Sequence, residues 1–549
     1  MDPDISFPED AVSLDDEAVG AALPALAASG GPTGSPANSM TRRAIHGSVL
    51  TFVGYGGSQL IRFGSNIILT HLLFPRAFGL MVLVNVLMQG LQMFSDLGIG
   101  PAIIKHTRTH DPDFFNTAWT IQVIRGIALW LAGCAIAVPV ASFYGTPMLA
   151  SMLPVAALTA LISGFNSTKL YIEGRELRLA RVIGIEVLSQ IVSLSVMILL
   201  ARYWGSVWSL VLGGVLGTLL KALLSHIALP GMSNRFCWDR PSARHLYHFG
   251  RWIFVSTLFT FLAMQCDRLL LGRLTSIEEL GIYSIALGMV SIGTGVFEQL
   301  ANRILMPAMA HYRRESRHQF ENVVLKTRRL ILSAAAIAVA NLILLAPALF
   351  DLLYDPRYHA AGKISQWLGL GLWFTLLQRT SQASLLAAGR SGALALANAC
   401  NCVVTLIAAP IGFHFWGLEG FIAGWTLGNL IATVIVDTSL ARDGIELRWQ
   451  GAALTLALLA FVAIGFGLQH AFGAQFAHNE HPWFLALLSP AILTTFAVAV
   501  MYLDYRNSAF GRSRALARKV AGRTVALPED AAETLSTSAA SGGNGRTQA

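Results

Sequence analysis

Charged residues are scarce in this chain. Only 13% of its 549 residues are Asp, Glu, Lys or Arg, whereas 54% are hydrophobic. Soluble domains carry about 25% charged residues, so this composition excludes an ordinary soluble enzyme or binding module. Apolar stretches long enough to cross a bilayer, which takes roughly 20 residues, recur from about residue 45 to residue 503. They leave no room for a large soluble domain.

Cysteine is also rare. The five cysteines are scattered, and none has the spacing of a zinc site or of a disulfide framework. The Walker, zincin and nucleophile-elbow motifs are absent, so we expect no ATP hydrolysis, no cofactor and no metal. His478, Glu480 and His481 lie in the last predicted outward loop. Without a helix to arrange them, a solvated loop is the preferred interpretation.

The apolar stretches predict about fourteen transmembrane helices in an all-α, polytopic membrane protein. Twelve of them form two groups of six, and a final pair follows. The predicted ranges are 45–70, 77–104, 116–143, 147–167, 180–201 and 205–229 for the first group, 249–271, 279–303, 328–350, 363–388, 393–413 and 416–440 for the second, and 451–471 and 483–503 for the pair.

These groups suggest five parts of the chain. Residues 1–40 are acidic and then rich in Ala, Gly, Ser and Pro, which predicts a disordered cytoplasmic tail without a signal peptide. An N-terminal six-helix lobe at 41–230 and a C-terminal six-helix lobe at 231–445 follow. The extra helix pair occupies 446–504, and a basic cytoplasmic tail occupies 505–549.

The basic residues encode an orientation in the membrane. The formal charge of +8 resides mainly in loops between apolar stretches, which excludes nucleic acid as a partner. Arg42 and Arg43 precede the first helix, and basic clusters follow the even-numbered helices, as in Arg175, Arg178 and Arg181. The opposite loops carry few basic residues. The positive-inside rule therefore predicts that both termini lie in the cytoplasm.

An internal repeat relates the two groups of helices. When residues 78–80 are aligned with residues 280–282, two helix pairs about 200 residues apart come into register. Polar positions then recur at matching depths: Asn66 with Arg268, Gln89 with Ser291, Gln92 with Thr294, and Asp96 with Glu298. Both copies start in the cytoplasm, as in parallel repeats related by an axis along the membrane normal. Two six-helix bundles around a central cavity are expected.

Polar side chains form stripes on the predicted helices. They recur three and four residues apart, so each stripe lies on one helix face. A charge at mid-membrane costs roughly 2.5 to 3.5 kcal/mol, so the stripes should face a wet cavity. Guanidinium groups suit a diphosphate, and amides suit sugar hydroxyls. The expected substrate-binding residues are Gln59, Arg62, Asn66, Gln89, Gln92, Arg125, Arg268 and Arg379.

The alternative is that these groups join helices, for instance through a pair between Arg62 and Asp96. Three carboxylates, Asp96, Glu186 and Glu298, could couple transport to an ion gradient by binding and releasing protons. Helix capping or ion pairing is the alternative for them, and for Glu298 it is favoured because Arg303 is close in sequence.

Four blocks then carry a family resemblance. Residues 69–104, together with 173–180, 204–214 and 267–283, resemble the polysaccharide transporter (Wzx-type) family of the multidrug/oligosaccharidyl-lipid/polysaccharide (MOP) flippase superfamily. The resemblance covers about residues 45–440. It implies a MOP-type fold in a bacterial inner membrane, with both lobes working by alternating access.

The resemblance also implies a cargo. A flippase of this kind moves polyprenyl-diphosphate-linked oligosaccharide repeat units from the cytoplasmic to the periplasmic leaflet, for exopolysaccharide, capsule or O-antigen synthesis. Its partners would be the lipid bilayer, a polysaccharide polymerase and a chain-length regulator. The final helix pair would offer a lateral groove for the lipid tail.

Other functions stay open at this stage. A multidrug antiporter of the same superfamily would favour acidic and aromatic cavity walls, whereas arginines prevail here. A membrane polysaccharide polymerase or ligase would need a sizeable outward loop, and every predicted outward loop is short. A peptidoglycan-precursor flippase would share the mechanism and differ only in its cargo.

Overall fold

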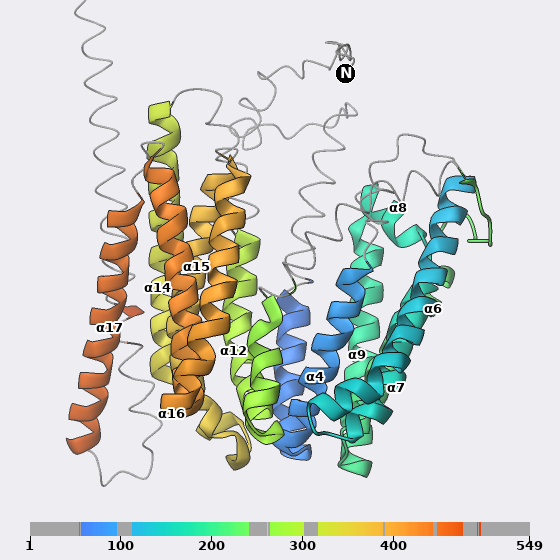
Figure 1. Cartoon of the computed structure of the whole chain (residues 1–549), viewed down its shortest axis with the longest axis horizontal. Coiled ribbons are helices and arrows are strands. Elements are labelled where there is room, and N and C mark those ends of the chain that lie inside the picture. The colour runs from blue at the N-terminus through green and yellow to red at the C-terminus, as the bar shows by residue number, and fades with distance from the viewer. Residues whose placement is uncertain are drawn as a thin grey trace, which may run out of the picture.

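The structure is a computed structural model that describes residues 56–95, 112–176, 178–240, 264–300, 317–387, 390–442 and 447–475, with positions 54, 261, 491, 494 and 495 besides (Figure 1). In these ranges the regular secondary structure is helical. Along the chain the elements are residues 56–72, α4 (Pro75–Phe94), α6 (Pro112–Phe143), α7 (Met148–Gly164), α8 (Lys169–Arg175), α9 (Leu179–Trp204), α10 (Trp208–Ile227), residues 264–274, α12 (Ile277–Leu300), α14 (Arg317–Leu353), the short 3-10 helix η2 (Pro356–Tyr358), α15 (Ala360–Ala387), α16 (Ser391–Ala441) and α17 (Arg448–Gln475).

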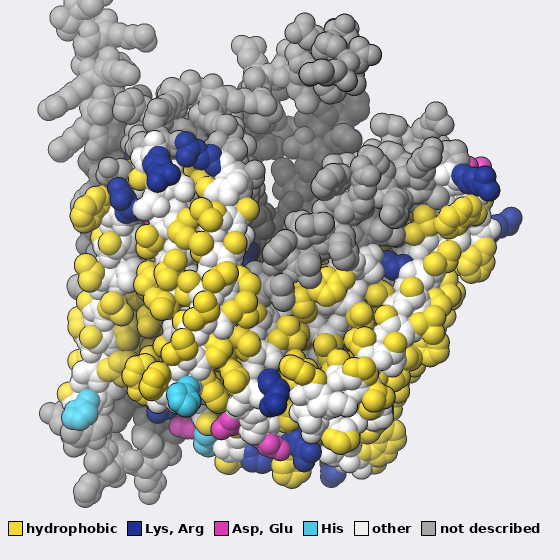
Figure 2. Space-filling view, in the orientation of Figure 1, with side chains coloured by type: hydrophobic (Ala, Val, Ile, Leu, Met, Phe, Trp, Pro, Cys, Tyr) yellow, Lys and Arg dark blue, Asp and Glu magenta, His cyan; other side chains and the backbone are white. Residues whose placement is uncertain are grey.

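The all-α, multi-pass fold class is confirmed. Among the described residues, eight helices are long and apolar enough to cross a membrane, and α7 with α8, bent by 59°, adds a ninth. Figure 2 shows hydrophobic side chains over the middle of one face, with charged side chains gathered near its upper and lower ends. The count of fourteen stays a prediction, because the last predicted helix, 483–503, is described only at residues 491, 494 and 495.

α16 contains two of the predicted helices. Its backbone leaves helical geometry at Trp416 and Gly417, and Gly417 has a φ of 59°, a conformation that glycine adopts without steric cost. A Cβ atom on Gly412 would lie 2.1 Å from the carbonyl oxygen of Gly420, so the chain folds back on itself there. The predicted boundary between 393–413 and 416–440 is therefore confirmed.

α14 is longer than predicted. The apolar window placed this helix at 328–350, whereas it runs from Arg317 to Leu353. A hydropathy window detects only the part of a helix that lipid surrounds. A helix can continue beyond the bilayer, where its residues need not be apolar.

Two groups of helices make up the described structure (Figure 1). α6, α7, α9 and α10 pack on one side, α14, α15, α16 and α17 pack on the other, and α4 and α12 contact each other between them. The ribbons lie close together at the lower end of the view and diverge toward the upper end. The lobe limits at residues 230 and 445 stay predictions.

Reciprocal glycine contacts join α4 to α12. A Cβ atom on Gly79 would lie 1.9 Å from the carbonyl oxygen of Ile277, and one on Gly281 would lie 2.0 Å from that of Pro75. In the repeat register, Gly79 matches Gly281 and Pro75 matches Ile277. Two copies related by a twofold axis make such mutual contacts, so the packing agrees with the proposed repeat.

A loop of the second group covers the tip of the first two helices. The Tyr358 hydroxyl donates to the carbonyl of Leu73 at 2.9 Å, and the Arg357 guanidinium lies 4.5 Å from the ring centre of Phe74. Asp355 accepts from Arg357 at 2.6 Å, and this hydrogen bond lowers the pKa of Asp355 to about 2. These contacts close the lower end of the molecule between the two groups.

Arg328 holds the second group together. Its side chain is fully buried. The guanidinium donates to Thr380 on α15 at 3.2 Å and to Gln450 on α17 at 3.2 Å. It also donates to Ser381, whose hydroxyl donates in turn to Asp437 of α16 at 2.6 Å. One buried guanidinium thus connects four helices and fixes α17 to the rest.

Candidate functional site

A polar cavity of about 370 Å³ lies between the two groups, where α4 and α12 approach each other. Four helical segments and the loop after α14 line it. The lining residues are Gln59, Arg62, Phe63 and Asn66 of residues 56–72, Val82, Asn85, Val86 and Gln89 of α4, Arg268 of residues 264–274, Ser284, Ile285, Leu287, Gly288, Met289, Ser291 and Ile292 of α12, and Tyr354. Because Tyr354 precedes the closing loop, the cavity ends at the closed end of the molecule.

The internal repeat relates many of the residues that line the cavity. In the register that aligns residues 78–80 with 280–282, every lining residue of α4 has a counterpart that also lines the cavity. The pairs are Val82 with Ser284, Asn85 with Leu287, Val86 with Gly288, and Gln89 with Ser291. Asn66 and Arg268 form a fifth pair. The cavity therefore surrounds the axis that relates the two repeats.

The charge of the cavity is positive. Arg62 and Arg268 both line it, and no Asp or Glu is among the described residues that do. Arg62 is exposed, and its guanidinium has no ion-pair or hydrogen-bond partner among the described residues. A guanidinium in this position can donate a fork of two hydrogen bonds to an anionic ligand.

A chain of hydrogen bonds positions Arg268. Its guanidinium donates to the side chain of Gln265, and the amide of Gln265 donates to Gln89 on α4. Gln265 is buried, and the neighbouring Asp267 accepts a 2.9 Å hydrogen bond from Tyr283 of α12. The arginine is thus oriented by contacts that cross from one repeat to the other.

Arg125 and Gln92 lie elsewhere. Both line a second cavity, of about 180 Å³, inside the first group of helices. The Arg125 guanidinium donates to the Ser95 hydroxyl and to the Gln92 carbonyl, each at 2.8 Å. It therefore binds the carboxyl-terminal end of α4, where a cation also stabilises the helix dipole.

Arg379 lines neither of these two cavities. It lies on α15 and is exposed, and on the same helix Gln382 donates to Asn398 at 3.3 Å. The assignment of all eight residues to substrate binding therefore stays a prediction, since the two cavities each bring together only some of them. The cavity of about 370 Å³ brings together five of them: Gln59, Arg62, Asn66, Gln89 and Arg268.

The three carboxylates have different outcomes. Glu186 accepts from Lys221 of α10 at 2.8 Å, so it takes part in the ion pairing named as the alternative to ion coupling. Asp96 and the side chain of Glu298 lie outside the described residues. The suggested pair between Arg62 and Asp96 falls there as well.

Several residues of the site were missed by the sequence analysis. Gln265 lies one helical turn before Arg268, a spacing that places the two side chains on one face. Ser284 could have been found because it lies seven residues, or about two turns, before Ser291 on the same face of α12. Tyr354 gives no such signal, because only the fold brings its loop to the cavity.

The chain matches a family of proteins described as "Polysaccharide biosynthesis protein" over residues 68–363. It is also similar to the teichuronic acid biosynthesis protein TuaB of Bacillus subtilis (strain 168), with 22% identity over 301 residues. That alignment covers 55% of this chain and 62% of TuaB. The chain thus spans about three fifths of the length of this relative.

Two solved structures share the fold. The lipid II flippase MurJ in an inward closed conformation aligns with a TM-score of 0.66 and 13% identity, over 84% of this chain and 99% of MurJ. An inward-facing multidrug resistance MATE family transporter of the MOP superfamily aligns with a TM-score of 0.54 and 15% identity, over 72% of this chain and 95% of that one. At these identities the likeness shows the MOP-type fold alone.

Proposed function

The chain belongs to the polysaccharide biosynthesis protein family, and from that premise we propose that it is a lipid-linked oligosaccharide flippase. It would move polyprenyl-diphosphate-linked repeat units from the cytoplasmic to the periplasmic leaflet by alternating access. A polysaccharide polymerase and a chain-length regulator would then act on the delivered units.

The positive cavity between the two repeats carries this proposal. It combines Arg62 and Arg268 with the amides of Gln59, Asn66 and Gln89. The guanidinium groups suit a diphosphate, and the amides can both donate to and accept from sugar hydroxyls. A cationic drug would meet like charge here, which disfavours the multidrug antiporter.

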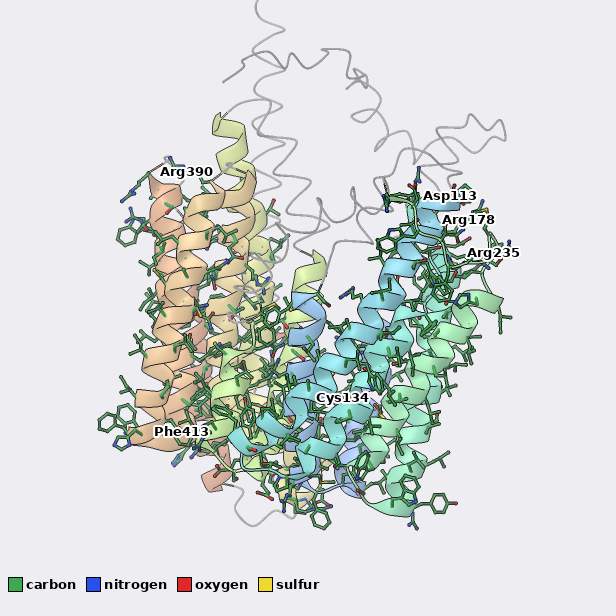
Figure 3. All side chains as sticks on the ribbon, turned by 45° about the vertical axis from the view of Figure 1, so that its right-hand side comes forward. Asp113, Cys134, Arg178, Arg235, Arg390 and Phe413 are labelled. Atoms are coloured by element: carbon green, nitrogen blue, oxygen red, sulfur yellow. The ribbon has the colours of Figure 1, made fainter. Side chains whose placement is uncertain are left out.

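The distribution of basic residues supports an orientation. Arg178, Arg235 and Arg390 lie at one end of the molecule, and Phe413 lies at the opposite end (Figure 3). By the positive-inside rule the first end faces the cytoplasm. The closed end would then face the periplasm, and both termini would be cytoplasmic.

In alternating access, the cytoplasmic and periplasmic ends of the molecule would open in turn. The cargo diphosphate would bind Arg62 and Arg268 while the periplasmic end is held by the glycine contacts of α4 with α12 and by the loop after α14. Release would require these contacts to separate. Coupling through Asp96, Glu186 or Glu298 stays a prediction, and for Glu186 its ion pair with Lys221 supplies the competing structural role.

Transport by the purified chain tests the proposal. The full-length protein is reconstituted into proteoliposomes that contain the lipid-linked repeat unit of its host, and the glycan in each leaflet is measured with a membrane-impermeant glycosidase. Protein-dependent redistribution of the glycan is expected.

Deletion of the gene gives a second test. Loss of the polymer, with repeat units retained in the cytoplasmic leaflet, is the expected phenotype. Unchanged polymer together with higher sensitivity to cationic drugs would replace the flippase with the antiporter.

A further inference from the structure

Tyr354 brings the loop after α14 to the wall of the central cavity of about 370 Å³. It directly follows Leu353, the last residue of α14, and its main-chain N–H donates to the carbonyl of Phe350 at 3.1 Å. The centres of the Tyr354 and Phe350 rings lie 4.4 Å apart, and Phe350 is fully buried. The helical turn and the ring contact together hold the Tyr354 side chain in one place at the cavity.

The hydroxyl of Tyr354 has no partner in the described part of the protein. No described residue donates a hydrogen bond to it or accepts one from it. Tyr354 is 5% exposed, so the protein encloses more than nine tenths of the residue. The hydroxyl is nevertheless not among the partnerless polar atoms of the described residues that the protein shields completely. Because Tyr354 lines the central cavity, it is from this cavity that a ligand can reach the hydroxyl.

The Tyr354 hydroxyl adds a neutral donor to a positively charged lining. Burial raises the pKa of Tyr354 to about 12, so the hydroxyl keeps its proton at neutral pH. Arg62 and Arg268 line the same cavity, and no Asp or Glu does among the described residues. Guanidinium groups can only donate, and a protonated tyrosine can donate once more. These donors together suit a ligand that is rich in acceptor oxygens.

The corresponding tyrosine of the first repeat has a different role. α6 and α14 are the third helices of the two predicted groups, and each is directly followed by a tyrosine, Tyr144 or Tyr354. The main-chain N–H of Tyr144 donates to the carbonyl of Val140 at 3.0 Å, so this tyrosine also continues its helical turn. Its hydroxyl, however, donates to the main-chain carbonyl of Leu269 in the second repeat at 3.4 Å. Tyr144 thus joins the two repeats, whereas the hydroxyl of Tyr354 is left to the cavity.

Tyr354 also belongs to the loop that closes the lower end of the molecule. Four positions later in this loop, the Tyr358 hydroxyl donates to the carbonyl of Leu73 at 2.9 Å. Tyr358 does not line the cavity, and its hydroxyl serves the closing contact instead. One short loop therefore presents one tyrosine to the cavity and uses the other to close the end.

We propose that Tyr354 is a cargo-binding residue, whose hydroxyl donates to an oxygen of the diphosphate-sugar head group while the periplasmic end is closed. This inference rests on the proposed flippase function. Because Tyr354 belongs to the closing loop, a bound head group and a closed loop favour each other by linkage. The cavity is then loaded from the cytoplasm while the periplasmic end is held shut.

Tyr354→Phe and Tyr358→Phe form a matched pair, since each removes one hydroxyl from the same loop. The full-length protein in nanodiscs is measured in two ways. Its melting temperature is recorded without cargo, and binding of the lipid-linked repeat unit of the host is measured by native mass spectrometry. Tyr354→Phe removes a hydroxyl that has no protein partner, so it should melt as wild type does and bind the unit about three- to tenfold more weakly. Tyr358→Phe loses the bond to Leu73, so it should melt at a lower temperature and bind within about twofold of wild type.

A second probe, polyprenyl diphosphate without sugar, identifies the acceptor. If Tyr354→Phe binds both probes more weakly, the hydroxyl donates to a phosphate oxygen. If it binds only the sugar-bearing unit more weakly, the hydroxyl donates to a sugar oxygen. Either result supports the assignment of Tyr354 to the cargo.

Equal binding by wild type and Tyr354→Phe would overturn the proposal, because the hydroxyl would then meet only water. Wild-type binding together with a lower melting temperature would also overturn it and would give the hydroxyl a structural role. The two proposals fail in different ways. Flipping by wild type with normal binding by Tyr354→Phe would keep the flippase and reject the role of Tyr354. Weaker binding by Tyr354→Phe without any flipping by wild type would keep the role of Tyr354 and reject the flippase.

Discussion

Residues 56–72 with α4, and residues 264–274 with α12, occupy equivalent places around the central cavity, but their side chains differ. Where the first repeat has Asn66 and Gln89, the second has Arg268 and Ser291. Arg62 matches Met264 in the same register. Each repeat therefore contributes one guanidinium, at depths one helical turn apart. The backbone symmetry makes a cavity on the axis, and unlike side chains make that cavity selective.

Among the differences between the two repeats, loss of the guanidinium groups should have the largest effect on flipping. Arg62→Gln and Arg268→Gln are each expected to reduce flipping by about 10- to 100-fold, because a hydrogen bond to a charged group contributes about 1.5 to 3 kcal/mol. Flipping in proteoliposomes measures the loss. Arg202→Gln, exposed in the last turn of α9, is the matched control. Wild-type rates in both cavity variants would show that the arginines do not bind the cargo.

The reciprocal glycines test the backbone symmetry. Gly79→Ala and Gly281→Ala should each destabilise the closed end by roughly 1 to 3 kcal/mol, because the added methyl group overlaps a carbonyl of the other repeat. A cysteine placed at Tyr354, in a chain without the native cysteines, should then react faster with an impermeant thiol reagent from the outside.

Gly64→Ala is the control for this pair, since nothing lies within 4 Å of the added Cβ atom. The twofold relation predicts similar effects of Gly79→Ala and Gly281→Ala. A strong effect of one with none of the other would show that the contact is not symmetric.

Substitutions of Gln265 test a feature that only the second repeat has, namely an arginine held in place by a neighbouring amide. Gln265→Leu should weaken flipping about three- to tenfold, since Arg268 keeps its charge and loses only the hydrogen bond that orients it. The apparent affinity for the lipid-linked unit should fall more than the maximal rate. Gln265→Glu keeps an acceptor for Arg268 and should restore much of the affinity, whereas a purely structural role would leave both variants equally impaired.

Removal of the ion pair at the closed end should have the smallest of these effects. Asp355→Asn is expected to lower the free energy of unfolding by about 0.2 to 1 kcal/mol, because the pair with Arg357 is near the surface. Asp355 has its pKa lowered from 3.8 to about 2, so its contribution is present above pH 4 and is lost as the pH falls through 2. The difference in melting temperature between wild type and Asp355→Asn should be constant from pH 5 to 8. A difference that changes in that range would contradict the assignment.

Much of the fold could be predicted from hydropathy, because lipid imposes one length and one polarity on each span. The stripe on residues 56–72 was also predictable, since helical periodicity alone puts Gln59, Arg62 and Asn66 on one face. The position of Arg379 was not predictable in this way. A stripe gives the polar face of α15, but only packing decides which cavity, if any, that face meets.

Arg328 and Arg125 also show that a sequence pattern does not predict what a side chain contacts. Both are basic residues that a sequence pattern assigns to the cytoplasmic end or to a lumen. In the structure Arg328 is buried among α14, α15, α16 and α17, and Arg125 binds the end of α4. A guanidinium has five donors, and the acceptors that satisfy them come from helices far apart in sequence.

The sequence by itself determined the membrane-spanning helices, the internal repeat and the polar face of each cavity-lining helix, because these depend on composition and on the periodicity of a single helix. The tertiary structure alone decided that five of the eight polar candidates meet at the axis, that the loop after α14 closes one end, and that Tyr354 of this loop lines the central cavity. Those outcomes depend on how the helices pack around the axis. Neither hydropathy nor periodicity predicts which hydrogen-bond acceptor is left without a donor.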